Sequence, residues 1–87
     1  MELKEEFIEL RQKYADIQVY RGCTDGSEEL AYYVYKSALE SFKKKIESKK
    51  WKLTLNDSIV EGTGMNDVLE KEIMYLDVNE VVSFEVE

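Results

Sequence analysis

The chain contains no histidine, no proline and only one cysteine, Cys23. Without histidine, one subunit has no Cys-His pair and no Ser-His-Asp triad, two arrangements that commonly activate a nucleophile. A transition-metal site has almost no ligands here, because such sites depend on histidine nitrogens and cysteine sulfurs. A lone cysteine also has no partner for an internal disulfide, which suits a reducing compartment.

Long apolar runs are missing as well. No stretch approaches the roughly 18 apolar residues that suggest a membrane-spanning helix. The start of the chain, Met1–Glu6, lacks the basic residues and apolar run of a signal peptide. With no proline, no repeat and no low-complexity linker, the 87 residues predict a single domain, 1–87. We expect a soluble, cytoplasmic protein.

What the chain does have is charge, and the two signs are unevenly distributed. Residues 1–30 carry eight acids and four bases, residues 31–52 carry two acids and seven bases, and residues 53–87 carry nine acids and one base. The formal net charge is −7. Apolar residues still make up 44% of the chain, which argues against disorder. Charge on this scale affects which partners a protein meets rather than how it folds.

The beginning of the chain has the spacing of an amphipathic helix. Apolar residues recur at alternating steps of four and three, at Leu3, Phe7, Leu10 and Tyr14. This spacing predicts a helix over residues 2–15 with one face packed on a sheet. Residues 17–21 alternate and include β-branched and aromatic side chains, so we expect a short strand there. Two glycines and an Asp-Gly step predict a loop over residues 22–27.

The next segment predicts a long helix over residues 28–49. Ser27 is a favoured N-cap residue, and two glutamates follow it where the helix dipole favours negative charge. The apolar face consists of Ala31, Tyr35, Ala38, Leu39, Phe42 and Ile46. Lysines and glutamates share the other face with Tyr33. An alternative interpretation makes Leu30–Tyr35 a strand paired with residues 17–21, because the Tyr-Tyr-Val-Tyr run favours strand.

From Trp51 the apolar period changes to two, which predicts strands. Residues 51–55 form the first of them. Asn56–Ser58 is a predicted turn, and Ile59–Glu61 returns as a second strand. The two glycines of Gly62–Gly64 predict a break or a bulge after it.

The end of the chain is less regular. Asn66–Glu72 predicts either a short helix capped by Asn66 or a loop, and Ile73–Val78 predicts a third strand. Residues 77–80 then turn the chain. In the last strand polar residues alternate with three apolar ones, Val82, Phe84 and Val86, so one face is expected to be exposed to solvent.

These elements together predict an α+β fold. We expect an antiparallel sheet of three to five strands with two amphipathic helices packed on one face. Most of the sheet comes from residues 51–87, with residues 17–21 as a candidate edge strand. The predicted core consists of Phe7, Leu10, Leu39, Phe42, Ile46, Trp51, Leu53, Val82 and Phe84.

The residue types that carry chemistry form no recognised motif. Cys23 lies two residues after Arg21, but no histidine is present to accept its proton. The segment Gly22–Ser27 lacks the lysine that a Walker-type phosphate loop places before its serine. The carboxylates of Asp67, Glu70, Glu72 and Asp77 do not have the spacing of a calcium loop. We therefore expect no enzyme activity, no cofactor and no metal site, and we assign no catalytic residue.

The basic stretch Lys43–Lys52 suggests one alternative function, a small nucleic-acid-binding module. Lysines with an interleaved aromatic residue, here Trp51, can bind a single-stranded nucleic acid. The net charge of −7 opposes this, because the long-range field repels a phosphate backbone. We do not expect direct nucleic-acid binding.

A second alternative is a self-assembling structural or adaptor protein. Its interface would be the apolar stripe of the first helix, formed by Leu3, Phe7, Leu10 and Tyr14. The stripe lasts barely two heptads, which is shorter than a coiled coil requires. The chain is therefore expected to be a monomer or a small homo-oligomer.

The acidic last third is the most suggestive surface. Carboxylates held on a rigid sheet can imitate nucleic-acid phosphates and occupy the basic groove of a larger protein, with electrostatic steering of the encounter. An exposed aromatic side chain is a candidate anchor beside them. The predicted partner-binding residues are Asp57, Glu61, Asp67, Glu70, Glu72, Asp77, Glu80, Glu85 and Tyr33. The alternative is that these are ordinary solubilising charges.

In its small size, its acidity and its lack of catalytic motifs, the chain resembles small phage-encoded inhibitors of bacterial defence. That class includes anti-CRISPR proteins and other DNA mimics. The resemblance depends mainly on the acidic run Asp57–Glu87. It implies a viral, non-enzymatic inhibitor that binds a larger protein, and it carries no individual functional residue over to this sequence.

Overall fold

The structure, a computed structural model, describes all residues, 1–87. In chain order its elements are α1 (Lys4–Val19), α2 (Ser27–Ile46), β1 (Lys50–Leu55), β2 (Ile59–Thr63), α3 (Asp67–Tyr75), η1 (Val78–Glu80) and β3 (Val81–Val86). The predicted α+β class and the antiparallel sheet are confirmed. The sheet has three strands, and there are three α-helices where the sequence predicted two.

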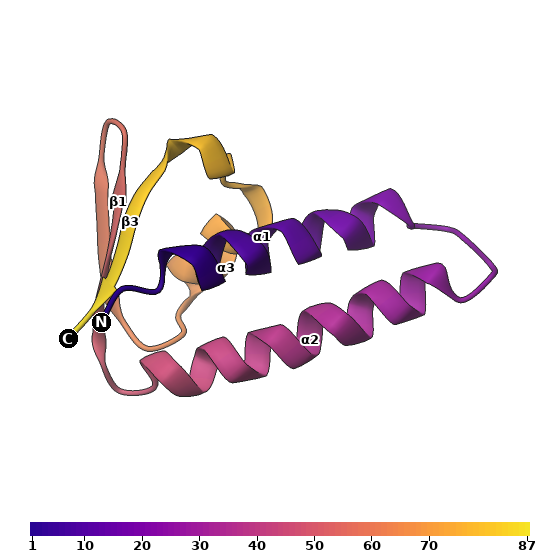
Figure 1. The fold of residues 1–87 in the computed structure, drawn as a ribbon, viewed down its shortest axis with the longest axis horizontal. Helices are drawn as coiled ribbons and strands as arrows, with labels where there is room; N and C mark the ends of the chain where they lie inside the picture. The colour runs from indigo at the N-terminus through magenta and orange to yellow at the C-terminus, as the bar shows by residue number, and fades with distance from the viewer.

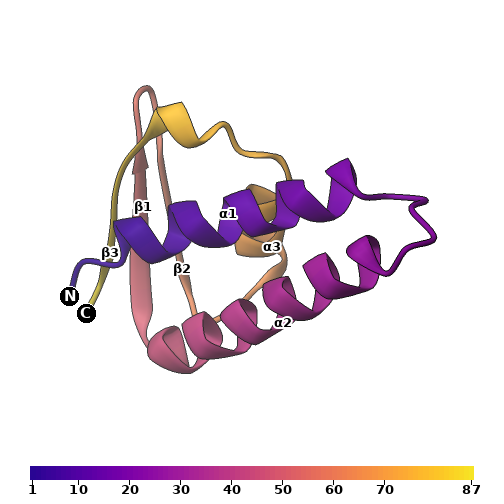
Figure 2. The same cartoon turned by 45° about the vertical axis from the view of Figure 1, so that its right-hand side comes forward.

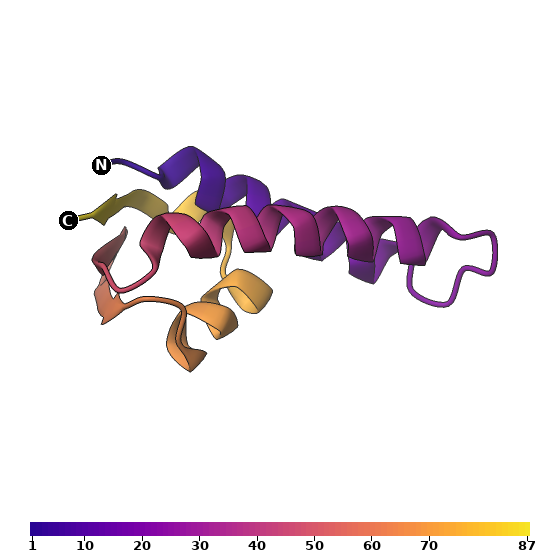
Figure 3. The same ribbon diagram turned by 90° about the horizontal axis from the view of Figure 1, so that it is seen from below.

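The strands form one antiparallel sheet in the order β2-β1-β3, with β1 at its centre. The helices lie on one side of this sheet, and its other side is uncovered (Figure 1). α1 and α2 run antiparallel as a helical hairpin whose distal half extends beyond the sheet (Figure 2). α3 packs on one side of that hairpin (Figure 3). The molecule is therefore elongated, with extents of 41, 26 and 20 Å.

α1 is held to the rest of the molecule by the predicted apolar stripe. Leu3, Phe7 and Leu10 are buried. Tyr14 packs edge-on against Tyr35 of α2, with ring centroids 5.3 Å apart. The stripe is covered by the protein's own core, so the hypothesis that it serves as an interface for self-assembly is wrong.

α1 continues to Val19, so the strand predicted over residues 17–21 is wrong. Ile17 extends the helical stripe and packs against the core, whereas Val19 and Tyr20 are exposed. The helix satisfies this backbone within itself, and Tyr20 N–H still donates to Asp16 O at 3.1 Å. A strand here would need a neighbouring strand, and the sheet lies at the other end of α1 (Figure 1).

α2 is the predicted long helix, and the alternative strand over Leu30–Tyr35 is wrong. The helix presents Tyr35, Phe42 and Ile46 to the core. These residues are spaced by seven and four positions, so one continuous helix places all three on the same side. A strand over the first turns would break that alignment.

The N-cap of α2 is Gly26 and not the predicted Ser27. Gly26 has a φ of 90°, in the left-handed region that glycine adopts without a steric penalty. Ser27 is the first helical residue, and its backbone N–H donates to Asp25 Oδ1 at 3.0 Å. Two glutamates in the first turn and three lysines in the last complement the helix dipole.

β1 and β2 form the predicted hairpin, in which Trp51 pairs with Gly62. Of the break or bulge predicted at Gly62–Gly64, the break is present: β2 runs through Gly62 without a bulge and ends at Thr63, and Gly64 has a φ of 62°. Gly62 is a position of close approach: a Cβ would lie 2.6 Å from Trp51 Cζ2 and 2.6 Å from Asn66 Nδ2. Its small size lets the indole lie beside β2, where Trp51 Nε1 donates to Gly64 O at 2.7 Å.

α3 confirms the helical alternative for the segment after Asn66. Asn66 Oδ1 accepts a hydrogen bond from Leu69 N–H at 2.9 Å and so caps the helix. The strand predicted over Ile73–Val78 is wrong, because α3 continues to its ninth residue and η1 follows. Leu69 and Ile73 are fully buried, whereas Lys71 between them is exposed. In a strand Lys71 would point to the same face as both, so this burial pattern requires a helix.

β3 is the predicted last strand, but its buried and exposed residues do not alternate strictly along its length. The pairing with β1 shifts between Thr54 and Leu55, so that Leu55 pairs with Val81. As a result Val81 is buried and Val82, which was predicted in the core, is 49% exposed. One extra residue in a strand reverses the side to which the following positions point.

The outer edge of β3 is covered by the first residues of the chain. Leu3 N–H donates to Phe84 O at 2.8 Å, and Val86 N–H donates to Met1 O at 2.9 Å. Glu2 Oε1 accepts from Phe84 N–H at 3.1 Å and from the first backbone amide of α1 at 3.0 Å. One carboxylate therefore joins the start of α1 to the sheet.

The core contains fifteen buried apolar side chains, and four aromatic rings meet within it. The ring of Phe84 lies 5.3 Å from Phe7 of α1, 5.4 Å from Phe42 of α2 and 5.6 Å from Trp51 of β1, between centroids. Seven of the nine predicted core residues are buried. The exceptions are Leu39, which packs at the margin, and Val82.

Replacing Phe84 by alanine removes the ring that contacts the other three. We expect the free energy of unfolding to fall by about 3–5 kcal/mol, a large share of the roughly 5–15 kcal/mol of a typical domain. Urea denaturation followed by tryptophan fluorescence measures the change. Val82→Ala, an exposed position on the same strand, is the matched control and should cost less than about 1 kcal/mol. Equal losses in the two variants would contradict a central role for the ring.

Tyr35 lies where the hairpin meets α3, and its side chain is only 6% exposed. Burial, with smaller contributions from Tyr14 and the Glu70 carboxylate, raises the pKa of Tyr35 to about 12 from its usual 10.0. The neutral phenol is thus favoured in the folded state. Its contribution to stability is fully present below pH 10 and is lost as the pH rises through about 12.

We therefore expect the free energy of unfolding to fall between pH 10 and pH 12 by about 1–2 kcal/mol more in the wild type than in Tyr35→Phe, since one pKa unit corresponds to about 1.4 kcal/mol. Urea titrations at several pH values measure this difference. Tyr33→Phe changes an exposed tyrosine of the same helix and should keep the wild-type pH dependence. Identical pH profiles for the wild type and Tyr35→Phe would rule out this role for the phenol.

Candidate functional site

The uncovered side of the sheet is the first candidate binding surface. Alternate residues of each strand point to this side, away from the helices. We call it the sheet face, and its residues are Lys50, Lys52, Thr54, Ile59, Glu61, Thr63, Ser83, Glu85 and Glu87. The ladder of β1 with both neighbours holds these side chains at fixed spacings.

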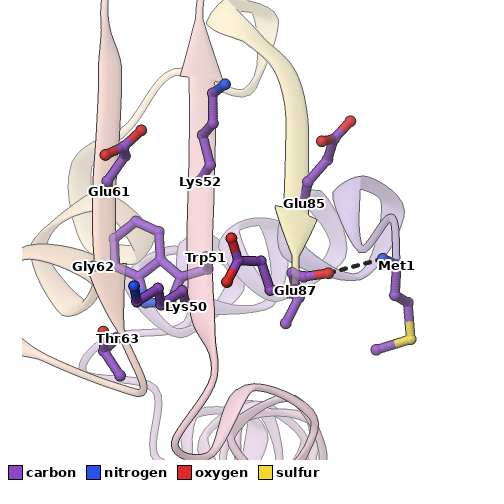
Figure 4. Close-up of a pocket in the computed structure, with 10 residues that line it drawn as sticks. Met1, Lys50, Trp51, Lys52, Glu61, Gly62, Thr63, Glu85 and Glu87 are labelled. Atoms are coloured by element: carbon purple, nitrogen blue, oxygen red, sulfur yellow. Dashed lines mark hydrogen bonds between the residues drawn. The ribbon is translucent and has the colours of Figure 1, made fainter.

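A row of three charges crosses the middle of the sheet face. Lys52 of β1 pairs with Glu61 of β2 on one side and with Glu85 of β3 on the other. The three exposed side chains rise from three adjacent strands (Figure 4). Directly opposed residues in an antiparallel sheet have Cβ atoms about 4.5–5.5 Å apart, close enough for opposite charges to attract. The order of charge across the row is negative, positive, negative.

The sheet face is hollowed around this row. The depression has a volume of about 670 Å³, and its lining also includes Lys50, Thr63 and Glu87. At its edge the amino group of Met1 donates to Val86 O at 2.8 Å (Figure 4). Small-molecule sites are usually enclosed and mostly apolar. This open depression with charged and hydroxyl groups is better suited to contact with a polar surface of another macromolecule.

Two more predicted carboxylates, those of Asp57 and Glu80, lie at the rim of the sheet face, where β1 turns into β2 and β3 begins. Asp57 belongs to the turn between β1 and β2. Asn56 N–H donates to Glu80 O at 3.0 Å, which holds that turn against η1. The rim therefore extends the acidic part of this surface. Asp77 caps η1, with its Oδ1 accepting from Asn79 N–H at 2.9 Å, but it lies on the helical side, where it lines a cavity with Arg11 and Gln12 of α1.

The remaining predicted residues lie elsewhere. Asp67, Glu70 and Glu72 belong to α3, on the helical side of the sheet. Tyr33 lies on the distal half of α2 and is 71% exposed. The structure therefore divides the predicted partner-binding residues among the sheet face, its rim, the helical side of the sheet and the hairpin. It does not bring them together on one surface.

None of the predicted carboxylates forms an ion pair. The two ion pairs of the protein join Glu9 to Lys13 at 2.7 Å and Glu6 to Lys45. The hydrogen bond and positive charge of Lys13 lower the pKa of Glu9. Both pairs involve acids of α1, so the carboxylates of residues 53–87 remain available to another molecule.

A second exposed surface, of which the sequence predicted only Tyr33, lies at the distal end of the helical hairpin. We call it the hairpin patch, and its residues are Val19, Tyr20, Leu30, Tyr33 and Val34. Leu30, Tyr33 and Val34 follow the spacing i, i+3, i+4 on the side of α2 away from its buried residues. The signal was present in the sequence, because this helix has apolar residues on two sides rather than one.

The basic stretch Lys43–Lys52 does not form one surface. Its first lysines close the last turn of α2, whereas Lys50 and Lys52 belong to the sheet face. Trp51 is 2% exposed, and its indole N–H is bonded to Gly64 O. Its ring is therefore not available to stack on a base, as the nucleic-acid hypothesis requires.

The loop between α1 and α2 carries the exposed Cys23. Local hydrogen bonds define this loop: Gly22 N–H donates to Glu28 Oε2 at 3.1 Å. The hydrogen bonds of Ser27 to Asp25 lower the pKa of the Asp25 carboxyl. No group of three or more histidine, cysteine, aspartate or glutamate side chains is placed to hold a metal ion.

The chain was compared with protein-family models, with curated proteins and with solved structures, and none of these comparisons found a match. No helix combines the length and the apolar character needed to traverse a lipid bilayer. The two surfaces described above are therefore the features that bear on function.

The row Glu61–Lys52–Glu85 makes a prediction about stability. Lys52→Glu places three carboxylates side by side, and we expect the free energy of unfolding to fall by about 0.5–1 kcal/mol at low salt. The neutral variant Lys52→Gln should lie between it and the wild type. In 1 M NaCl the differences should shrink, because the Debye length falls to about 3 Å. Equal stability of all three proteins at low salt would mean that the charges of Glu61, Lys52 and Glu85 do not interact measurably.

Proposed function

We propose that this protein is a non-enzymatic protein-binding protein that attaches to a basic surface on a larger protein. The observation that carries the proposal is the sheet face, which is uncovered, hollowed and held rigid by strand pairing. Glu61 and Glu85 stand on it without an ion pair. Lysine or arginine side chains of a partner can reach both carboxylates from solvent.

The charge balance supports a basic partner. The sheet face and its rim together carry five carboxylates, those of Asp57, Glu61, Glu80, Glu85 and Glu87, against the two ammonium groups of Lys50 and Lys52. An acidic surface of this kind speeds encounter with a basic one and disfavours acidic competitors. Binding of this type weakens as salt rises.

A narrower form of the proposal is an inhibitor that occupies the nucleic-acid-binding groove of its partner, as the class resemblance suggests. The net charge of −7 and the free carboxylates support it. A phosphate backbone is uniformly negative, whereas the charge alternates across Glu61, Lys52 and Glu85. We therefore propose binding to a basic protein surface as the function, and mimicry of a nucleic acid as one way of performing it.

The test is affinity capture of a partner from cell lysate at low salt, with the double variant Glu61→Gln/Glu85→Gln beside the wild type. We expect the double variant to bind at least about tenfold more weakly, because two charge-assisted contacts are lost. The control is Glu5→Gln/Glu47→Gln, which removes the same charge from exposed positions elsewhere. Equal weakening by both pairs, or a partner retained unchanged in 1 M NaCl, would contradict a specific acidic site.

The narrower form is tested on the captured partner. If mimicry is correct, the wild type displaces a labelled nucleic acid from it, and Glu61→Gln/Glu85→Gln does so less effectively. Simultaneous binding of the nucleic acid and this protein would contradict mimicry while leaving the protein-binding function intact.

A further inference from the structure

The hairpin patch concentrates the exposed apolar surface of the protein. Five of the eleven large apolar side chains that are exposed belong to it, and Leu30 and Tyr33 are 65% and 71% exposed. Tyr20, Leu30 and Val34 line one open depression between α1 and α2, and exposed apolar groups that gather in this way mark interaction sites. No element of the chain packs over the patch, because the hairpin has extended past the sheet at this point (Figures 1 and 2).

The charges beside the patch are arranged in a definite order along α2. Glu29 precedes Tyr33 by one helical turn, and Lys36 follows it by about one turn, so the three share one side of the helix. All three are exposed. Neither charge is in an ion pair, and Lys36 Nζ lies 5.8 Å from the centre of the Tyr32 ring. Along the helix the order is acid, aromatic, base.

We propose that the hairpin patch is covered by a second copy of this chain, with the two α2 helices packed antiparallel about a two-fold axis near Tyr33. A two-fold axis reverses the order of the row, so Glu29 of each copy faces Lys36 of the other. Leu30, Tyr33 and Val34 of both copies then meet around the axis. A parallel arrangement would place Glu29 against Glu29 and Lys36 against Lys36, which is repulsive.

The shape of the molecule permits this arrangement. From Tyr33 to the start of α2 the helix extends only about 9 Å, whereas from Tyr33 to its end near the sheet it extends about 20 Å. The tip of one hairpin therefore stops short of the sheet of the other copy. The two sheet faces point away at opposite ends of the pair, so the proposal is independent of the function proposed for them.

Contact over a few helical turns is at the small end of protein interfaces, so we expect a dissociation constant of roughly 1–100 μM. Sedimentation equilibrium over a wide concentration range tests this. We expect the mass to rise from the 10.2 kDa of one chain towards twice that value. All proteins carry Cys23→Ser, so that a disulfide between exposed thiols cannot imitate the association.

Variants test the geometry. Glu29→Lys and Lys36→Glu should each weaken association at least tenfold, because like charges then face each other across the axis. Leu30→Ser should weaken it as well, and Ile59→Ser, an exposed apolar position on the sheet face, should not. The changed residues are exposed, so circular dichroism should show an unaltered fold.

Charge exchange is the decisive measurement. A mixture of Glu29→Lys and Lys36→Glu chains should associate again, because every facing pair becomes attractive. One chain that carries both changes should also self-associate. A wild type that stays monomeric at 500 μM, single variants that associate like the wild type, or a mixture that remains monomeric would each overturn the proposal. None of these results affects the test of the sheet face with Glu61 and Glu85.

Discussion

The contact of Phe84 with the rings of Phe7, Phe42 and Trp51 is the interaction on which the rest of the structure depends. A three-stranded sheet has no second layer of its own, and it becomes stable by packing on helices. Phe84 lies on the last strand, whereas Phe7 lies on the first helix. Closing the core therefore brings the two ends of the chain together. The Glu2 carboxylate, which bonds to both α1 and β3, lies at this junction.

The two candidate surfaces have a common origin in the dimensions of the elements. α2 has 20 residues and is about 30 Å long, whereas the six residues of β1 span about 20 Å. The helices cover only one side of the sheet, and they are too long for it. The uncovered side carries alternating charges, and the excess length of the hairpin carries exposed apolar side chains. One surface suits a charged partner, and the other suits an apolar one.

Sequence reasoning succeeded where the local pattern was unambiguous. The first-helix stripe of Leu3, Phe7 and Leu10 and the hairpin after Trp51 are both present. At Asn66 the pattern left a helix or a loop open, and the structure has the capped helix. The prediction failed at Ile73–Val78, because a short apolar run fits a strand or a helix equally well. Leu69 and Ile73 are buried with Lys71 exposed between them, a pattern that only the helix allows. Val82 was misplaced for another reason. The side of the sheet to which Val82 points depends on an irregular pairing of β3 with β1, a segment that is distant in the sequence.

The amino-acid order alone determined the helical periods of α1 and α2 and the lack of histidine-based chemistry, because these depend on neighbouring residues or on composition. Only the tertiary structure decided which charges share a surface. Glu61, Lys52 and Glu85 form a row because strand register aligns Lys52 with Glu61, nine residues later in the chain, and with Glu85, 33 residues later. Tyr33 is separated from them because α2 extends past the sheet. The number of acids in residues 53–87 reveals neither the register of the strands nor the fact that α2 is longer than the sheet. It therefore could not show which of these residues share a surface.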